Sequence, residues 1–157
     1  RTCKTQPGYL RSAYPISNFA ERSSGFYKAV RAAGMSSSRS IVHKLTPSME
    51  GAYADMMELI KNGEELAPCY FADNDLIAVG AIKALKEADT GPQDIGIVGF
   101  DNLPLGSVIE PALTTIHVPK QYMGEAAAQK LIDLLHTPGQ PPTKTEVSTM
   151  LVKRGTV

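Results

Sequence analysis

The chain has 157 residues, of which 43% are hydrophobic and 20% are charged. A chain of this length buries about two-thirds of its unfolded surface in one globular domain, so it needs neither disulfides nor a metal ion to fold. Sixteen basic and sixteen acidic residues give a formal net charge of zero, which argues against the broad basic surface of a nucleic-acid-binding domain.

Apolar runs and helix signals alternate along the first hundred residues. The apolar runs predict strands at 7–10, 40–45, 69–72 and 95–100. Helices are predicted between them, at 18–34, 48–62 and 76–88, followed by a turn at 90–94. Asn18 and Ser48 are the expected N-caps, and Gly34 and Gly63 the expected stops. This order predicts an α/β fold in which a parallel sheet lies between two layers of helices.

The regular alternation of strands and helices changes after Asp101. We expect a short helical turn at 103–111, a strand at 113–118, a helix at 119–136 and a final strand at 147–153. Pro119 suits the first position of its helix. The Pro-rich loop at 137–142 is the candidate for a boundary or hinge.

Two of the predicted strands end in acidic and amide residues. One run reads CYFADND over 69–75, and the other reads IVGFDN over 97–102. Buried parallel strands are continuous apolar runs, and ligands of open α/β sheets bind just beyond the carboxyl ends of the strands. The pattern therefore predicts recognition of a small molecule.

Arg22 lies among apolar residues on the first predicted helix. Phe19, Phe26 and Val30 share its face, because three- and four-residue steps stack on a helix. An unpaired buried charge is costly, so we expect Arg22 either to meet a carboxylate such as Asp101 or to reach a polar ligand. A structural ion pair, or a side chain that extends to water, is the alternative.

The strand-end residues also have simpler explanations. Asn74 and Asp75 precede a helix and are good caps, and Asp101 and Asn102 are common turn residues. What favours a site is that Arg22, Asn74 and Asp101 come from separate segments that converge on one end of the sheet. A carboxylate accepts two hydrogen bonds, and an amide or guanidinium donates them, which suits the neighbouring hydroxyls of a sugar.

Other classes of protein find less support. Cys3 and Cys69 form no Cys-x-x-Cys or Cys/His cluster, so the sequence predicts no disulfide, metal site or cofactor and favours a reducing, cytoplasmic location. It contains no apolar stretch long enough to span a bilayer, and its start is not signal-like. Because it lacks an initiator methionine, we expect a fragment of a longer protein.

An enzyme is the weaker hypothesis. Asp73-x-Asp75 after an apolar strand superficially resembles the nucleophile motif of haloacid-dehalogenase-type phosphatases, with Asp101 as a magnesium ligand. However, Ile77 stands where that motif has Thr or Val, and no suitable lysine follows. No Ser-His-Asp arrangement and no phosphate-binding glycine loop are recognisable.

Several runs together resemble the effector-binding domain of the LacI/GalR family of bacterial transcription regulators. The runs are ERSSGF at 21–26, NDLIAVGA at 74–81, DIGIVGFD at 94–101, PALTTI at 111–116, MG at 123–124 and LVKR at 151–154. They cover nearly the whole chain in the family's order. The resemblance implies a periplasmic-binding-protein-like type I fold, which is Rossmann-like and has two lobes.

The resemblance implies that this chain holds an incomplete two-lobed domain. Residues 1–113 would form the carboxyl-terminal lobe, 114–146 would cross to the missing amino-terminal lobe, and 147–157 would return as the final strand. The helix at 119–136 would then lack its usual partner. Its apolar face, with Met123, Ala127, Leu131 and Leu134, would have to fold back or associate with another chain.

The family's effector-binding positions can be carried over residue by residue. They fall on Arg22, Asn74 and Asp101, with Asn18 and Thr46 as neighbouring pocket positions. Thr46 stands where relatives often place an aromatic ring, and Ile16 stands where purine-responsive relatives carry an arginine. Both departures argue against a purine effector.

The resemblance also implies a homodimer. Val79, Val108 and Ile109 match the family's apolar interface positions, with ordinary core packing as the alternative. The expected function is effector binding, with a carbohydrate as effector, in a regulator of sugar-utilisation genes whose operator DNA is bound by a headpiece absent from this chain. The alternative is the solute-binding protein of a sugar transporter.

Overall fold

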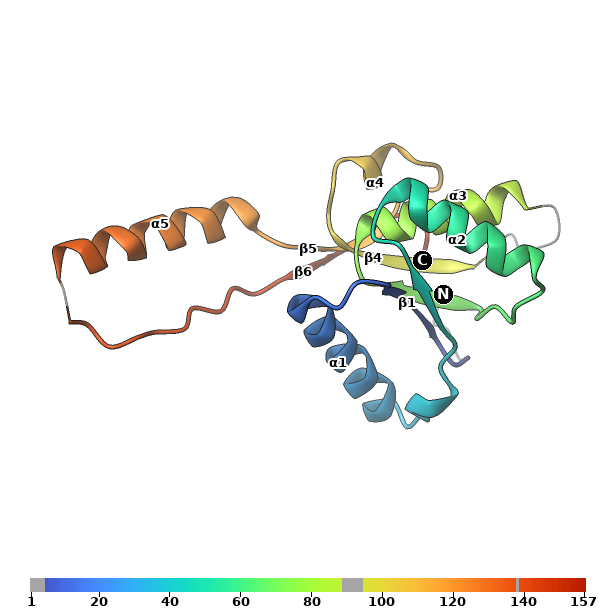
Figure 1. Ribbon diagram of the computed structural model, residues 1–157, viewed down its shortest axis with the longest axis horizontal. Helices are drawn as coiled ribbons and strands as arrows, with labels where there is room; N and C mark the ends of the chain where they lie inside the picture. Colours follow the sequence, from blue (N-terminus) through green and yellow to red (C-terminus); the bar gives the residue numbers. More distant parts are fainter. Residues whose placement is uncertain (1–4, 89–94, 138) are drawn as a thin grey trace.

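The computed structural model describes residues 5–88, 95–137 and 139–157. It contains a six-stranded sheet in the order β2-β1-β3-β4-β5-β6 (Figure 1). The strands are β1 Gly8–Ser12, β2 Val42–Leu45, β3 Cys69–Ala72, β4 Gly96–Asp101, β5 Thr114–His117 and β6 Met150–Val152. The first five run parallel, as predicted, and β6 runs antiparallel to β5.

Helices cover both faces of the sheet, which confirms the predicted three-layer α/β architecture. The helices are α1 Ser17–Ala32, α2 Met49–Lys61, α3 Asp75–Glu87, α4 Leu105–Val108 and α5 Lys120–His136. Helices α2 and α3 pack side by side over one face, and α1 lies on the other face (Figure 1).

Of the two predicted N-caps, one is confirmed and one is wrong. Ser48 caps α2 as expected, because its hydroxyl accepts a hydrogen bond from the Gly51 N–H at 3.0 Å. Asn18 does not cap α1, which begins at Ser17 after Ile16. The Asn18 side chain accepts a bond from the adjacent Phe19 N–H instead.

The sheet ends in one antiparallel strand, whose direction the sequence did not predict. β6 is antiparallel to β5 because the chain leaves the end of β5, passes through α5 and returns to the same end, where Met150 pairs with His117. The predicted turn at 90–94 lies outside the described residues.

The main core lies between the sheet and the α2–α3 layer. Fully buried side chains there include Leu10, Leu45, Met56 and Ile77. The inner strands β1 and β3 carry packed side chains on both faces, which explains their continuous apolar runs, whereas the edge strand β2 alternates between exposed and buried residues.

Aromatic rings fill the opposite side of the sheet, beneath α1. The Tyr9 ring stacks on Phe26 at 4.9 Å and on Phe71 at 5.7 Å between ring centroids. Val30 is buried on the same helix, so the predicted apolar stripe of α1 is the face that packs on the sheet.

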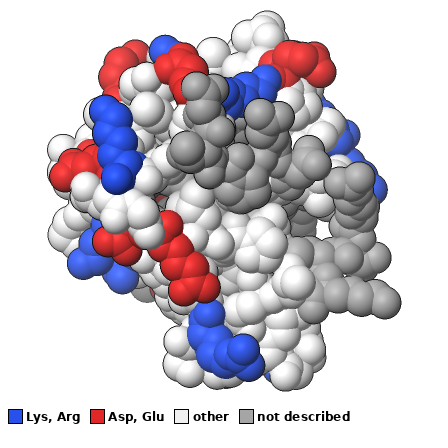
Figure 2. All heavy atoms as spheres, turned by 90° about the vertical axis from the view of Figure 1, so that its right-hand side faces the viewer, with Lys and Arg blue, Asp and Glu red and all other residues white. Residues whose placement is uncertain are grey.

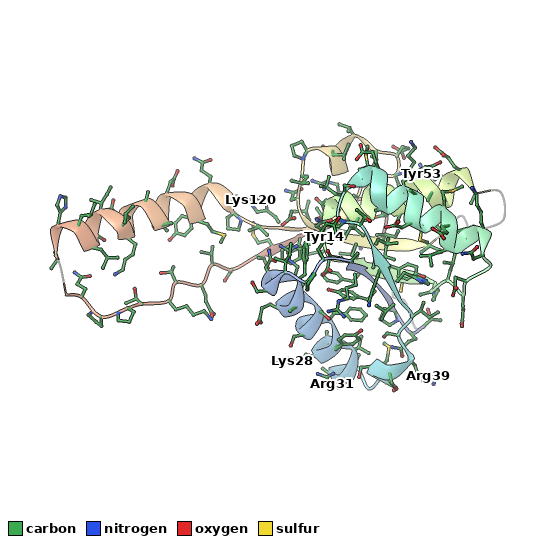
Figure 3. The ribbon with its side chains drawn as sticks, viewed as in Figure 1. Tyr14, Lys28, Arg31, Arg39, Tyr53 and Lys120 are labelled. Atoms are coloured by element: carbon green, nitrogen blue, oxygen red, sulfur yellow. The ribbon has the colours of Figure 1, made fainter. Side chains whose placement is uncertain are left out.

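Helix α5 extends away from the sheet as part of an arm (Figure 1). None of its residues is buried, and Leu131 and Leu135 are 61% and 72% exposed. Lys120 marks the point where the arm leaves the body (Figure 3). The apolar face of this helix therefore does not fold back onto the described part of its own chain.

The face of the molecule opposite the arm agrees with the neutral composition. Seen from the end of the molecule opposite the arm, basic and acidic side chains are interspersed (Figure 2). Among the described residues, no helix combines the length and apolar character that crossing a bilayer requires.

Candidate functional site

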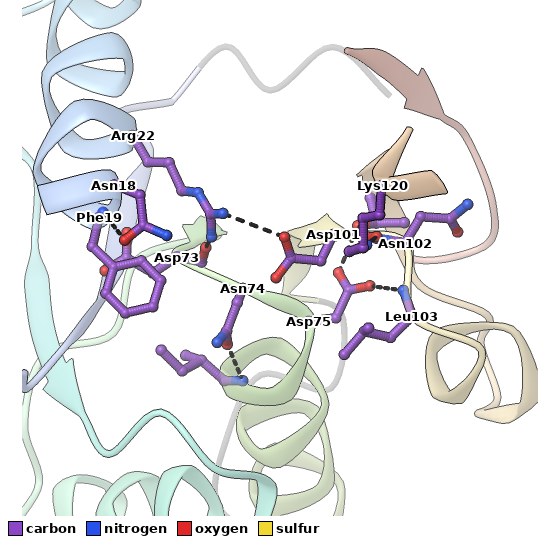
Figure 4. A network of polar contacts seen from close by, with 12 residues as sticks. Asn18, Phe19, Arg22, Asp73, Asn74, Asp75, Asp101, Asn102, Leu103 and Lys120 are labelled. Atoms are coloured by element: carbon purple, nitrogen blue, oxygen red, sulfur yellow. Dashed lines mark hydrogen bonds and ion pairs between the residues drawn. The ribbon is translucent and has the colours of Figure 1, made fainter. Parts of the chain in front are cut away.

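Three predicted site residues lie at one end of the sheet. Asp101 ends β4, and Asn74 stands between β3 and α3. Arg22 reaches toward them from the first half of α1 (Figure 4). Because β1, β3 and β4 are neighbours in the sheet, the parallel strands bring these segments together at their carboxyl ends.

Arg22 is paired, as expected, with Asp101. Its Nη2 lies 3.3 Å from Asp101 Oδ1, and its Nη1 donates a hydrogen bond to the Asp73 backbone carbonyl. The guanidinium carbon lies 3.9 Å from the centroid of the Phe100 ring, within the range of a cation–π contact. A guanidinium has five N–H donors, so these contacts leave donors for a ligand.

Asn74 is the N-cap of α3. Its side-chain oxygen accepts a hydrogen bond from the Ile77 N–H at 2.9 Å, so the capping alternative is confirmed. The cap fixes the orientation of the amide. No described residue accepts a bond from the Asn74 NH₂ group, which leaves that donor for a ligand.

Asp101 combines a polar side chain with an unusual backbone. Its φ is 109° and that of Asn102 is 50°, both in the left-handed region that few non-glycine residues adopt. Its carboxylate remains 22% exposed beside Arg22. The arrangement is a partly buried charged pair at a strand end, with some of each side chain still accessible.

The two neighbouring pocket positions differ. Asn18 is exposed on the first turn of α1, one turn before Arg22 (Figure 4). Thr46 follows the edge strand β2, and its backbone N–H donates to the Asp55 carboxylate at 2.6 Å. The Thr46 side chain packs against Gly51 at the start of α2, so its visible role is to join β2 to that helix.

The predicted interface residues separate into buried and exposed positions. Val79 is only 4% exposed and belongs to the hydrophobic core, which is the alternative that its sequence position left open. Ile109 is partly buried against the same core. Val108 is 77% exposed, so among these residues it offers the largest apolar surface to a partner.

The sequence reasoning missed three contacts of the site. Phe100 carries the Arg22 guanidinium on its ring, the Asp73 carbonyl accepts from Arg22, and the Lys120 ammonium donates to the Asp101 carbonyl. Phe100 and Asp73 stand beside residues that the strand-end pattern does select. No sequence pattern predicts the Lys120 contact with Asp101, because that contact depends on where the arm leaves the sheet.

The two carboxylates of the phosphatase-like motif are buried. Asp73 accepts hydrogen bonds from the Tyr9 hydroxyl and from the Ser12 N–H, and Asp75 accepts from the Leu103 N–H and the Thr115 hydroxyl. Both aspartates are 0% exposed. A carboxylate nucleophile must reach its substrate, so this geometry disfavours the phosphatase hypothesis. Among the described residues, no group of three or more His, Cys, Asp or Glu is arranged to hold a metal ion.

Burial gives Asp73 a testable pH dependence. Desolvation raises the pKa of Asp73 above its ordinary value of 3.8, although the Tyr9 and Ser12 donors oppose the shift. The native state then holds this proton to higher pH than the unfolded state does, so the Asp73 contribution to stability falls as pH rises through that window. Asp73→Asn removes the titration. We expect the free energy of unfolding of wild type, measured by urea unfolding, to fall relative to that of Asp73→Asn as the pH rises above about 4. A difference between the two proteins that does not change with pH would contradict the shift.

Comparison with known proteins identifies the family. The family model of the periplasmic binding protein-like domain matches residues 6–157. The chain is 34% identical over 123 residues to the transcriptional regulator GalS of Salmonella typhimurium, which covers 78% of this chain and 36% of the relative. It is 34% identical over 139 residues to the transcriptional repressor PurR of Klebsiella pneumoniae, which covers 88% of this chain and 40% of the relative. The chain thus spans well under half of these relatives' length.

A solved structure with the same fold was determined with a sugar bound. It is a LacI-family transcriptional regulator from Enterococcus faecium with bound ribose, 29% identical, with a TM-score of 0.85. The match covers 96% of this chain and 56% of that one. The chain therefore belongs to the periplasmic binding protein-like domain family, as found in the effector-binding domains of LacI/GalR-type regulators.

Proposed function

We propose that this chain binds a small carbohydrate as the effector of a LacI/GalR-type transcription regulator. The observation that carries the proposal is the partly accessible Arg22–Asp101 pair at the end of β4, with the Asn74 amide close by (Figure 4). The three side chains offer both acceptors and donors. Adjacent sugar hydroxyls, each a donor and an acceptor, complement such a set.

The ribose-bound relative supports a sugar over other small molecules. That protein shares the fold of nearly all of this chain at 29% identity. The Phe100 ring lies under the Arg22 guanidinium, at 3.9 Å, and keeps that cation facing the site. The side chains that would cover the second face of a sugar belong, in this proposal, to another lobe.

The proposal extends to the parts of the regulator around this site. Residues 1–117 with the returning strand at 147–157 form the carboxyl-terminal lobe, because β5 Thr114–His117 pairs with β4 and β6 in its sheet. The crossing to an amino-terminal lobe therefore begins after His117 rather than at residue 114, and extends to about residue 146. The exposed apolar face of α5 supports this division, because such a surface is normally covered by a partner. A homodimer that includes Val108 and Ile109, in the cytoplasm, would present paired headpieces to operator DNA.

Linkage explains how a sugar would act on DNA binding. An effector that prefers one relative orientation of two lobes shifts the population toward that orientation. The same free energy then changes the affinity of the headpieces for DNA. The sugar need not touch the DNA-binding surface.

A ligand screen tests the proposal on the full-length regulator. The panel contains mono- and disaccharides, sugar phosphates and purines, and the measured quantity is the melting temperature. We expect a sugar present at a hundred times its Kd to raise the melting temperature by about 2 to 4 °C. Asp101→Ala should abolish the shift, because it removes the acceptor and leaves Arg22 without its carboxylate.

Glu58→Ala provides the control for this screen. Glu58 is exposed on α2, away from the strand ends, so its replacement removes a carboxylate without touching the site. A panel in which no sugar shifts the melt refutes the carbohydrate proposal. A shift that survives Asp101→Ala refutes the placement of the site.

A further inference from the structure

A buried carboxylate lies behind the partly exposed Asp101. Asp75, the first residue of α3, is 0% exposed. Its Oδ2 accepts a hydrogen bond at 2.7 Å from the N–H of Leu103, two residues after Asp101 (Figure 4). One oxygen of Asp75 thus holds the backbone that follows the candidate ligand-binding residue.

The second oxygen of Asp75 reaches the same turn through Thr115. The Thr115 hydroxyl donates to Asp75 Oδ1 at 2.5 Å and accepts a bond at 3.3 Å from the N–H of Asn102. Thr115 lies on β5 and is 0% exposed. The two backbone N–H groups after Asp101 are therefore both tied to one carboxylate, one directly and one through a hydroxyl.

These hydrogen bonds hold a turn whose backbone angles are uncommon. Asp101 and Asn102 both have positive φ, which non-glycine residues adopt only when the surroundings determine it. Asp and Asn tolerate positive φ better than other non-glycine residues, but they still adopt it less readily than glycine does. The hydrogen bonds to Asp75 and Thr115 restrain the backbone of the turn from outside, while the Arg154 guanidinium holds the Asn102 side chain at 2.6 Å.

Gly99 shows that the fold reserves space for this carboxylate. A Cβ atom on Gly99 would lie 2.2 Å from Asp75 Oδ1 and 2.9 Å from a methyl group of Leu113. The φ of Gly99 is not in the positive range, so its backbone does not require glycine. The space above β4 is what requires it, and Asp75 fills that space.

We propose that Asp75 and Thr115 are positioning residues of the effector site, which hold the turn at 101–103 so that the Asp101 carboxylate faces Arg22 and the ligand. The inference rests on the proposed function. Both residues are fully buried, so they act on the ligand only through Asp101. Removing the Thr115 hydroxyl should therefore weaken binding without removing any contact to the sugar.

The neighbouring residue Thr114 provides a matched control. Thr114 is 1% exposed, and its hydroxyl accepts a hydrogen bond from the Arg154 N–H at 2.9 Å, on the side of the returning strand. Thr114→Val and Thr115→Val each replace a buried hydroxyl by a methyl group on β5. Only Thr115→Val removes a bond to the turn that follows Asp101.

The first measurement is ribose affinity by calorimetry on the full-length regulator. We expect Thr115→Val to raise the Kd about tenfold, and Thr114→Val and Thr115→Ser to change it less than about twofold. Equal losses in Thr114→Val and Thr115→Val would show a general effect on the fold and overturn the proposal. An unchanged Kd in Thr115→Val would overturn it as well.

A second measurement needs no ligand and separates this inference from the proposed function. Thr115→Val should speed the hydrogen exchange of the Asn102 and Leu103 amides about tenfold, and Thr114→Val should not. If wild type binds no ribose, the panel of sugars decides the proposed function, and exchange alone decides whether the turn is held as described. Unchanged exchange in Thr115→Val overturns the positioning role.

Discussion

Arg22→Ala is expected to weaken sugar binding by the regulator at least about a hundredfold. The guanidinium pairs with Asp101 at 3.3 Å and bonds to the Asp73 carbonyl, while its remaining N–H groups face the site. Truncation removes donors from the ligand and leaves the Asp101 carboxylate without its cation. The two losses act together, which is why this substitution has the largest expected effect on binding.

Arg22→Lys separates charge from geometry. Lysine keeps the positive charge, but it has no planar fork that can stack on Phe100 and bond to two acceptors at once. We expect an intermediate loss of about tenfold in affinity. Equal effects of Ala and Lys would show that the fork, rather than the charge, carries the interaction.

Arg31→Ala is the matched control on the same helix. Arg31 is exposed near the far end of α1, away from the strand ends (Figure 3). Its removal changes the net charge as Arg22→Ala does, so it controls for long-range electrostatics. Titration calorimetry with ribose measures all three variants, and a Kd for Arg22→Ala within twofold of wild type would remove Arg22 from the site.

The parts of the fold that depend on local patterns could be predicted from the sequence. The bounds of β3, the cap at Ser48 and the stop near Gly63 all follow from residues a few positions apart. The alternation of strands and helices then predicts the parallel sheet, and that sheet brings Asp101 to the strand end that Arg22 approaches.

The missed features depend on distant contacts. Thr115 reaches Asp75 across 40 positions of sequence, and no periodicity predicts that contact. The strand β6 is antiparallel because of where the arm returns, which its three residues cannot specify. Asn18 has the residue type of a cap, yet the helix starts one position earlier. A capping residue type therefore predicts that a helix starts nearby, but it does not identify the residue at which the helix starts.

Gly80→Ala is expected to lower the free energy of unfolding by about 3 kcal/mol. Gly80 lies in the middle of α3, where glycine is a poor helix former. Glycine is required at position 80 because α2 lies so close. A Cβ atom on Gly80 would lie 2.5 Å from the Met49 carbonyl oxygen and 2.9 Å from the Tyr53 nitrogen. Backbone atoms cannot rotate away, so α2 would have to shift.

Gly25→Ala makes the same change where there is room. Gly25 is exposed within α1, and a Cβ atom there would meet no other atom within 4 Å. Alanine is the better helix former, so we expect this variant to gain about 0.5 to 1 kcal/mol in stability. Urea unfolding of both variants tests the pair. If Gly80→Ala also gains stability, α2 and α3 do not pack as closely as the 2.5 Å approach at Gly80 indicates.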